Sequence, residues 1–273
     1  MKPPKYLIYP SLLDAFQDYL NSEDIYLRYW GNVDEPSVTA DEFEQKQLGG
    51  LIDKINRVQP DWEITEKMDR GTAFNEIVDC MILGKKSEKM QIEKVYATEM
   101  LDAANKEYSE VETNNVIALK ATYNNRTFQF PVSICREFAN YFKGATPQVY
   151  CEAGLPTQYG NVLLYGYIDE LMPISIHDIK VTGSYEAWKF KDKWQRVVYP
   201  YCINENGSDI TNFEYNILLI TENKGGTFYE TKTEYYNYTE HDKERLIVVC
   251  ERFIEFLEEN KELITDKKIF NKL

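Results

Sequence analysis

Apolar and polar residues alternate along this chain with two different periods, and the changes of period predict its elements. Apolar positions three and four residues apart, which line one face of a helix, recur in several segments. The helices expected from them cover residues 12–20, 40–56, 69–83, 90–106, 131–143 and 242–263. Residues 26–40 show neither period and contain Gly31 and Pro36, so a loop is expected there.

Strand-like runs of β-branched and aromatic residues fill the centre of the chain and one later stretch. The strands expected from them cover residues 117–123, 127–130, 148–153, 161–171, 174–181, 213–221 and 227–238. The short connections in the centre favour antiparallel pairing. After Gly183 the helical period returns through Tyr199, and Pro200 is expected to end that helix. The order of elements predicts an α+β fold in which helices flank a central mixed or antiparallel sheet.

Composition narrows the class of protein. The chain has 273 residues, of which 43% are hydrophobic, and it contains no internal repeat or obvious linker, so one domain spanning residues 1–273 is expected. It carries 45 acidic and 31 basic side chains, a net charge of -14. This balance excludes a protein that coats nucleic acid or an anionic membrane through its overall charge. Any contact with DNA has to use a local basic patch.

Cysteine spacing and the absence of long apolar runs indicate the cellular compartment in which the protein is expected. The five cysteines are far apart and form no C-x-x-C pair, which favours reduced thiols over a disulfide framework or a zinc site. No apolar run approaches the roughly 18 residues that span a bilayer, and the first residues lack a secretory signal. We therefore expect a cytoplasmic protein with no membrane partner.

Two carboxylates and a lysine stand close together in the central strand region. Asp169 lies in one expected strand, and Asp178 and Lys180 lie in the next, after a turn near Pro173. Because side chains alternate along a strand, Asp178 and Lys180 share one face. Two carboxylates on neighbouring strands are suited to Mg²⁺, and a nearby ammonium can orient a water molecule and offset charge on phosphate. The pattern predicts phosphodiester hydrolysis.

The same region resembles the PD-(D/E)XK nuclease superfamily, and specifically its RecB-like exonuclease branch. That branch carries G-x-x-D, then D-x-K, then Q-x-x-x-Y, with an upstream helix of the form G-x-x-x-H-x-x-x-E. The matching residues here are Gly166 with Asp169, Asp178 with Lys180, Gln195 with Tyr199, and Gly71 with Asn75 and Asp79. Asn75 replaces the histidine of the family pattern and Asp79 replaces the glutamate. An amide oxygen is acceptable to Mg²⁺ but is a poorer ligand for a transition metal.

The resemblance implies a fold, an activity and a set of site residues. The fold is a restriction-endonuclease-like core with a helical N-terminal addition and an insert at about residues 84–147. The activity is that of a metal-dependent DNA nuclease, an exonuclease linked to phage or mobile-element recombination or repair, and a recombination or single-strand-binding protein is a candidate partner. The catalytic residues it implies are Asp169, Asp178, Lys180, Gln195 and Tyr199. The ligands it implies for Mg²⁺ or Mn²⁺ are Asp169, Asp178, the Ile179 carbonyl, Asn75 and Asp79.

A basic and aromatic run lies next to these motifs. The residues expected to contact DNA are Trp188, Lys189, Lys191, Lys193 and Arg196. Lysines can bind phosphates while aromatic rings stack on unpaired bases. The alternative interpretation is a helix whose tryptophans are core and whose lysines are a solvated face.

The chain offers few residues for an iron–sulfur or a zinc site. Some RecB-like nucleases hold an iron–sulfur cluster on four cysteines, three of them near the C-terminus, but Cys250 is alone there, so no cluster is expected. Two histidines are too few for a histidine-rich zinc centre. Two rival functions stay open: a catalytically weak or inactive nuclease-fold module that binds DNA or protein, and a metal-dependent phosphohydrolase acting on nucleotides.

Overall fold

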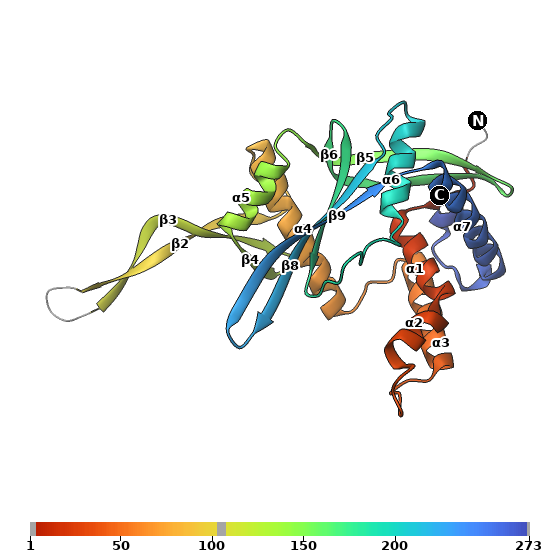
Figure 1. Cartoon of the computed structure of the whole chain (residues 1–273), viewed down its shortest axis with the longest axis horizontal. Helices are drawn as coiled ribbons and strands as arrows, with labels where there is room; N and C mark the ends of the chain where they lie inside the picture. The colour runs from red at the N-terminus through yellow and green to blue at the C-terminus, as the bar shows by residue number, and fades with distance from the viewer. Residues whose placement is uncertain (1–3, 103–107, 272–273) are drawn as a thin grey trace.

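A six-stranded mixed sheet forms the centre of the molecule (Figure 1). The computed structural model describes residues 4–102 and 108–271. The strands of this sheet are β1 (Tyr6–Ile8), β5 (Thr146–Thr157), β6 (Gly160–Met172), β7 (Ser175–Thr182), β8 (Asn212–Asn223) and β9 (Gly226–Asn237). Their order is β1-β6-β7-β8-β9, with β5 also paired to β6. The β1–β6 and β7–β8 pairs are parallel, and the others are antiparallel. The expected central strands, their antiparallel order and the later hairpin are confirmed.

Strand β6 has one fully paired edge and one interrupted edge. Its pairing with β5 runs along nearly the whole strand. On the opposite edge, β1 pairs with residues 162–164 and β7 pairs only with residues 170–172. The β6–β7 ladder therefore ends at the pair Glu170–His177, and the two strands separate beyond it.

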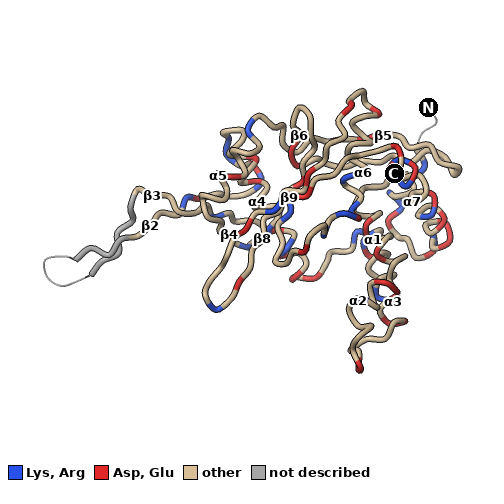
Figure 2. The backbone as a smooth tube through the Cα atoms, in the orientation of Figure 1, with Lys and Arg blue, Asp and Glu red and all other residues tan. Residues whose placement is uncertain are grey.

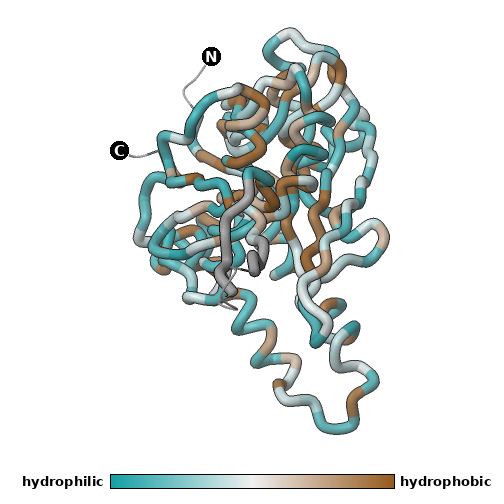
Figure 3. The backbone as a smooth tube through the Cα atoms, turned by 90° about the vertical axis from the view of Figure 1, so that its left-hand side faces the viewer, coloured by the Kyte–Doolittle hydropathy of each residue, from teal (hydrophilic) through white to brown (hydrophobic). Residues whose placement is uncertain are grey.

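Helices cover both faces of the sheet. They are α1 (Pro10–Leu20), α2 (Ser22–Trp30), α3 (Ala40–Ile55), α4 (Trp62–Leu83), α5 (Val132–Tyr141), α6 (Gln195–Glu205) and α7 (Glu240–Glu259), followed by the 3-10 turns η1 (Lys261–Leu263) and η2 (Lys267–Phe270). One apolar core joins the sheet to α1, α3, α6 and α7, and a second joins it to α4 and α5. Figure 3 shows the most hydrophobic segments inside the body, whereas the projecting end of α2 and α3 is mainly hydrophilic. Within the described residues, no helix has the length and apolar character needed to cross a membrane.

A small antiparallel sheet occupies most of the expected insert at 84–147. It contains β2 (Gln91–Asp102), β3 (Tyr108–Tyr123) and β4 (Arg126–Pro131), and its β2–β3 hairpin projects from the body (Figure 1). The helix expected at 90–106 is therefore wrong over β2, and the rest of it, residues 103–106, lies outside the described residues. The polar composition of this segment favoured a helix, but pairing with the long strand β3 decides the structure. Strand β4 and α5 share the core of α4, so this segment is not a separate unit.

Two further expectations are corrected near helix ends. Residues 22–30, half of them expected as loop, form α2, because Tyr26 and Trp30 pack on each other and on Phe43 of α3. The helix expected from Gly183 to Tyr199 begins only at Gln195 and continues past Pro200 to Glu205. A proline inside a helix costs about 3 kcal/mol, and the fully buried flanking residues of α6 offset that cost.

Candidate active site

The separation of β6 and β7 leaves room for the side chain of Asp169. Its Oδ2 accepts a hydrogen bond of 2.8 Å from the backbone N–H of Ile179 on β7. In a continued ladder that N–H would face a backbone carbonyl of β6, so the carboxylate substitutes for a ladder partner. The strands thus place Asp169 directly beside Asp178, the residue that precedes Ile179.

Asp178, Lys180 and Gln195 form a closed set of polar contacts. Lys180 Nζ lies 2.5 Å from Asp178 Oδ2 and donates to Gln195 Oε1 at 2.7 Å. Gln195 Nε2 in turn donates to Asp178 Oδ1 at 2.6 Å. Asp178 is buried, whereas the Lys180 side chain keeps 25% of its surface exposed. An ammonium has three N–H donors, so Lys180 retains one for a water molecule or a phosphate oxygen.

Burial disfavours the ionised form of both aspartates. Burial, followed by the negative charge of Asp178, raises the pKa of Asp169 to about 8. Burial also raises the pKa of Asp178, and Lys180 and Gln195 oppose that shift. Two buried carboxylates that share one region are stabilised by a positive charge placed between them.

Tyr199 supports this set from α6. Its ring is 5% exposed and packs against Gly166 on β6, where a Cβ atom would lie 2.6 Å from the ring carbon Cε1. Gln195 Nε2 lies 3.4 Å from the Tyr199 hydroxyl. Burial raises the pKa of Tyr199 well above its usual value, so the phenol is neutral at physiological pH. Gly166 is thus the residue that lets α6 approach the sheet.

Helix α4 contributes a third carboxylate, Asp79, which meets a residue that the sequence patterns did not single out. Asp79 is 6% exposed and faces Glu170 of β6, which is fully buried. Burial raises the pKa of Asp79 to about 6, and burial with the charge of Asp79 raises that of Glu170 to about 9. Asp79 Oδ1, both Glu170 carboxylate oxygens and the nearby Asn75 Oδ1 have no hydrogen-bond donor in the described structure. A signal was present in the sequence, because Glu170 directly follows the G-x-x-D tetrapeptide.

The remaining acidic residue of this part of α4 has a structural role. Glu76 accepts from Ser87 Oγ at 2.7 Å and pairs with Lys89 Nζ at 2.9 Å. These contacts fix the segment that leads from α4 into β2.

The oxygen ligands of the site are compatible with a hard divalent cation. Among the described residues, no group of three or more His, Cys, Asp and Glu side chains is arranged to hold a metal ion. Mg²⁺, however, commonly takes one or two carboxylates and completes its shell with water and phosphate. Asp169 and Asp178 are a pair of the kind that such a cation takes, and the charge of Asp79 acts on Asp169. Asn75 and the Ile179 carbonyl stay predictions as ligands.

The residues expected to contact DNA lie in an irregular segment rather than on a helix. Lys189 Nζ is held by its own loop, through Thr182 Oγ1 at 3.1 Å and Ser184 O at 2.6 Å. Arg196 is 13% exposed and lies 3.4 Å from Asp242. These two cations are therefore occupied by internal contacts. The helix that the alternative interpretation of the run assumed is absent at 183–194.

The other three members of the set are more accessible. Lys191 is exposed, Trp188 is 56% exposed, and Lys193 lies 3.7 Å from Asp18. Figure 2 shows that basic and acidic positions are interspersed along the backbone of the body.

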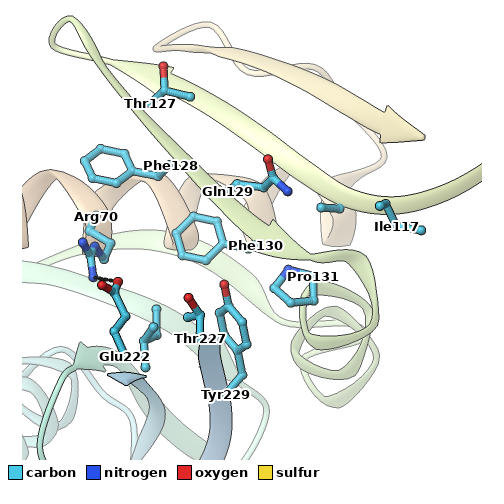
Figure 4. Close-up of a pocket in the computed structure, with 12 residues that line it drawn as sticks. Arg70, Ile117, Thr127, Phe128, Gln129, Phe130, Pro131, Glu222, Thr227 and Tyr229 are labelled. Atoms are coloured by element: carbon cyan, nitrogen blue, oxygen red, sulfur yellow. Dashed lines mark ion pairs between the residues drawn. The ribbon is translucent and has the colours of Figure 1, made fainter. Parts of the chain in front are cut away.

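A cavity of about 450 Å³ lies away from these residues, between the edge strands β4 and β9 (Figure 4). In Figure 4, Tyr229 and Thr227 project from β9 toward Phe130 of β4. An ion pair of 3.9 Å between Arg70 and Glu222 borders it. It contains none of the predicted site residues.

Comparisons with known proteins add little to the description of this site. No family model matches the chain, and no curated protein matches it significantly. One similar solved structure is described as "Crystal structure of SSO0001", with 12% sequence identity and a TM-score of 0.35. The match covers 46% of this chain and 56% of that one. The class that fold and site define is an α+β protein with a paired-carboxylate and lysine site on a mixed sheet.

Proposed function

We propose that this protein is a metal-dependent deoxyribonuclease that hydrolyses phosphodiester bonds, in keeping with its resemblance to RecB-like exonucleases. The observation that carries the proposal is the contact set of Lys180, Asp178 and Gln195 beside the Asp169 carboxylate. Exonuclease action, the cytoplasmic location and a recombination or single-strand-binding partner belong to the same proposal.

Each residue of the set has a separate task in this proposal. Asp169 and Asp178 would hold Mg²⁺ or Mn²⁺, which would supply Lewis acidity and neutralise charge on the phosphodiester. Lys180 uses its free N–H to orient the attacking water and to contact a phosphate oxygen. Gln195 fixes the position of the ammonium, and Tyr199 fixes the position of Gln195 through their shared helix face. The charge of Asp79 increases the negative potential at Asp169, whereas Glu170, whose pKa is raised to about 9, is neutral at physiological pH.

Cleavage of labelled single- and double-stranded DNA with Mg²⁺ or Mn²⁺ tests the proposal. We expect the wild-type protein to cut and the Asp178→Asn and Lys180→Met variants to be slower by about 10²- to 10⁴-fold. Lys224→Ala, in the exposed turn between β8 and β9, is the matched control and keeps its activity. Wild-type cleavage no faster than that of both site variants would refute the nuclease function.

A specific observation favours a second candidate, a module that keeps the nuclease fold but lacks activity. Asn75 stands where the family pattern has histidine, and its Oδ1 has no hydrogen-bond donor in the described structure. Thermal melting with increasing Mg²⁺, Mn²⁺ or Ca²⁺ separates the two. A cation at 100 times its Kd stabilises by about 2.7 kcal/mol, and the absence of any shift would favour the module.

A further inference from the structure

A cavity of about 500 Å³ lies outside the carboxylate site, between α1, α2, α3 and the segment 183–194. Its lining combines aromatic rings, basic groups and side-chain amides. The residues that carry the argument are Asp14, Asp18, Arg28, Tyr29, Trp30 and Lys193. Two of the three helices form the projection at the bottom of Figure 1.

The aromatic residues of the cavity are presented by a rigid support. Trp30 stacks on Tyr26 at 5.7 Å with an interplanar angle of 20° and packs on Phe43 at 5.7 Å. Tyr29 contacts the edge of Trp30 but is itself 66% exposed. An exposed ring that is held by a packed neighbour loses little conformational entropy when a ligand binds. Every nucleobase can stack on such a ring.

The charged residues that line the cavity balance one another, whereas the whole chain is strongly negative. Arg28, Lys189 and Lys193 balance Asp14, Asp18 and Asp192 in the lining, against a net charge of -14 overall. Two of the acids already have partners. Asp14 Oδ1 accepts from the Trp194 N–H at 2.9 Å, and Asp18 lies 3.7 Å from Lys193. Arg28 is exposed, and neither of these two acids is paired with it.

The inner wall of the cavity adjoins the carboxylate site. Asp14 binds the backbone N–H of Trp194, and the next residue, Gln195, holds both Lys180 and Asp178. Burial raises the pKa of Asp14, and the positive charges of Lys193 and Lys180 oppose that shift. Residues 194 and 195 therefore connect the wall of the cavity to the reactive groups.

We propose that this cavity binds unpaired nucleotides of single-stranded DNA adjacent to the bond that is cut. Tyr29 is the stacking platform, and Arg28 and Lys193 contact the phosphates. Unpaired bases are required, because both faces of each base in a duplex are covered by its neighbours. The inference rests on the proposed function for the position of the cut, and it assigns a single-stranded end as the substrate.

Binding measurements without cleavage test this inference. The anisotropy of a labelled oligothymidylate is followed with Ca²⁺ in place of Mg²⁺, and a hairpin duplex serves as the second ligand. We expect tighter binding of the single strand, a loss of about 5- to 100-fold in Tyr29→Ala, and near-complete retention in Tyr29→Phe. Tyr235→Ala, which removes a 62% exposed tyrosine from β9, is the matched control and binds as the wild type does.

The outcomes separate this inference from the nuclease function. Single-strand binding that depends on Tyr29, in a protein without cleavage, supports the cavity and refutes the enzyme. Cleavage that depends on Asp178, with normal single-strand binding by Tyr29→Ala, supports the enzyme and refutes the cavity. Tighter binding of the duplex than of the single strand, or no binding of the single strand by the wild type, also refutes the cavity. Circular dichroism of Tyr29→Ala checks that the fold is retained.

Discussion

The contact between Gly166 and Tyr199 gives a prediction at the scale of single residues. In Gly166→Ala, the new Cβ would lie 2.6 Å from the Tyr199 ring, so the ring or the strand has to move. We expect a loss of about 1–3 kcal/mol in the free energy of unfolding. Urea titration measures it, with Gly154→Ala on β5 as control, since a Cβ there meets no atom within 4 Å.

A double-mutant cycle identifies the cause of that loss. If the clash with Tyr199 is responsible, Gly166→Ala costs less in a Tyr199→Leu background, with a coupling of about 0.5–3 kcal/mol. Equal costs in the two backgrounds would show that Gly166 matters for another reason.

Glu170 gives a second residue-scale prediction, on pH. Its pKa in the folded protein is raised to about 9 from 4.5, so the folded state binds more protons than the unfolded state between these values. Its contribution to stability is fully present below about pH 4.5 and is lost as pH rises through 9. In EDTA, the free energy of unfolding of the wild type should therefore decrease from acid through neutral to alkaline pH. That of Glu170→Gln should decrease less.

The size of the effect is set by an unsatisfied buried carboxylate. We expect Glu170→Gln to be more stable than the wild type by about 1–3 kcal/mol at alkaline pH. Glu259→Gln, at the exposed end of α7, should follow the wild-type curve. Parallel curves for Glu170→Gln and the wild type would contradict the assignment.

The candidate site was predictable from sequence only where its residues lie close together in the chain. Asp178 and Lys180 share a strand face, and Gln195 with Tyr199 shares a helix face, so period alone places each pair. Glu170 and Asp14 were missed because their importance depends on contacts across the fold, with Asp79 of α4 and with Trp194. No local pattern encodes those distances.

At the scale of elements, a buried ion pair joins the small sheet to α4. Arg126 of β4 pairs with Asp69 of α4 and lies over the Trp62 ring at 3.6 Å, and Asn124 Nδ2 donates to Asp69 at 3.0 Å. Removing one member of a buried pair leaves the other charge unpaired, at a cost of about 3–5 kcal/mol. Asp69→Ala should therefore destabilise the protein by about that amount.

Hydrogen exchange shows where that destabilisation acts. In Asp69→Ala, the amides of β3 and β4 should exchange faster, while those of β5 and β6 keep their protection. Glu66→Ala breaks a solvent-exposed pair with Arg70 and should cost less than about 1 kcal/mol. Equal losses in the two variants would mean that the buried pair does not secure the small sheet.

The type of each element could be predicted from sequence where hydrophobic period and residue propensity agreed. The predictions were wrong where the two disagreed. The central strands, the two hairpins and the C-terminal helix have consistent signals. The composition of β2 favours a helix, and only its partner β3 makes it a strand. Pro200 favours the end of a helix, yet burial of its neighbours carries α6 past it. Tertiary contacts decided both cases.

At the scale of the whole molecule, the net charge of -14 makes added salt act on stability and on DNA binding in opposite directions. Added salt screens repulsion among the acidic residues and should raise the melting temperature. It should weaken binding of single-stranded DNA only modestly, since Arg28, Lys191 and Lys193 are the main accessible cations near the site. We expect log Kobs to fall with log salt at a slope of about -2.

Anisotropy titrations over a range of NaCl concentrations measure that slope. Arg28→Ala should make it less steep by about 0.7. A wild-type slope steeper than about -5 would indicate that DNA contacts a different and much more basic surface.

The separation of β6 and β7 determines which inactive variant is informative. Asp169 is both a proposed cation ligand and the acceptor for the buried Ile179 N–H. Asp169→Ala removes both roles, so lost activity in that variant cannot be distinguished from a loosened strand. Asp169→Asn keeps an oxygen for the Ile179 N–H and removes the negative charge. It is therefore the variant with which to trap an uncleaved DNA complex, and the Ile179 amide resonance would report whether the strand has stayed in place.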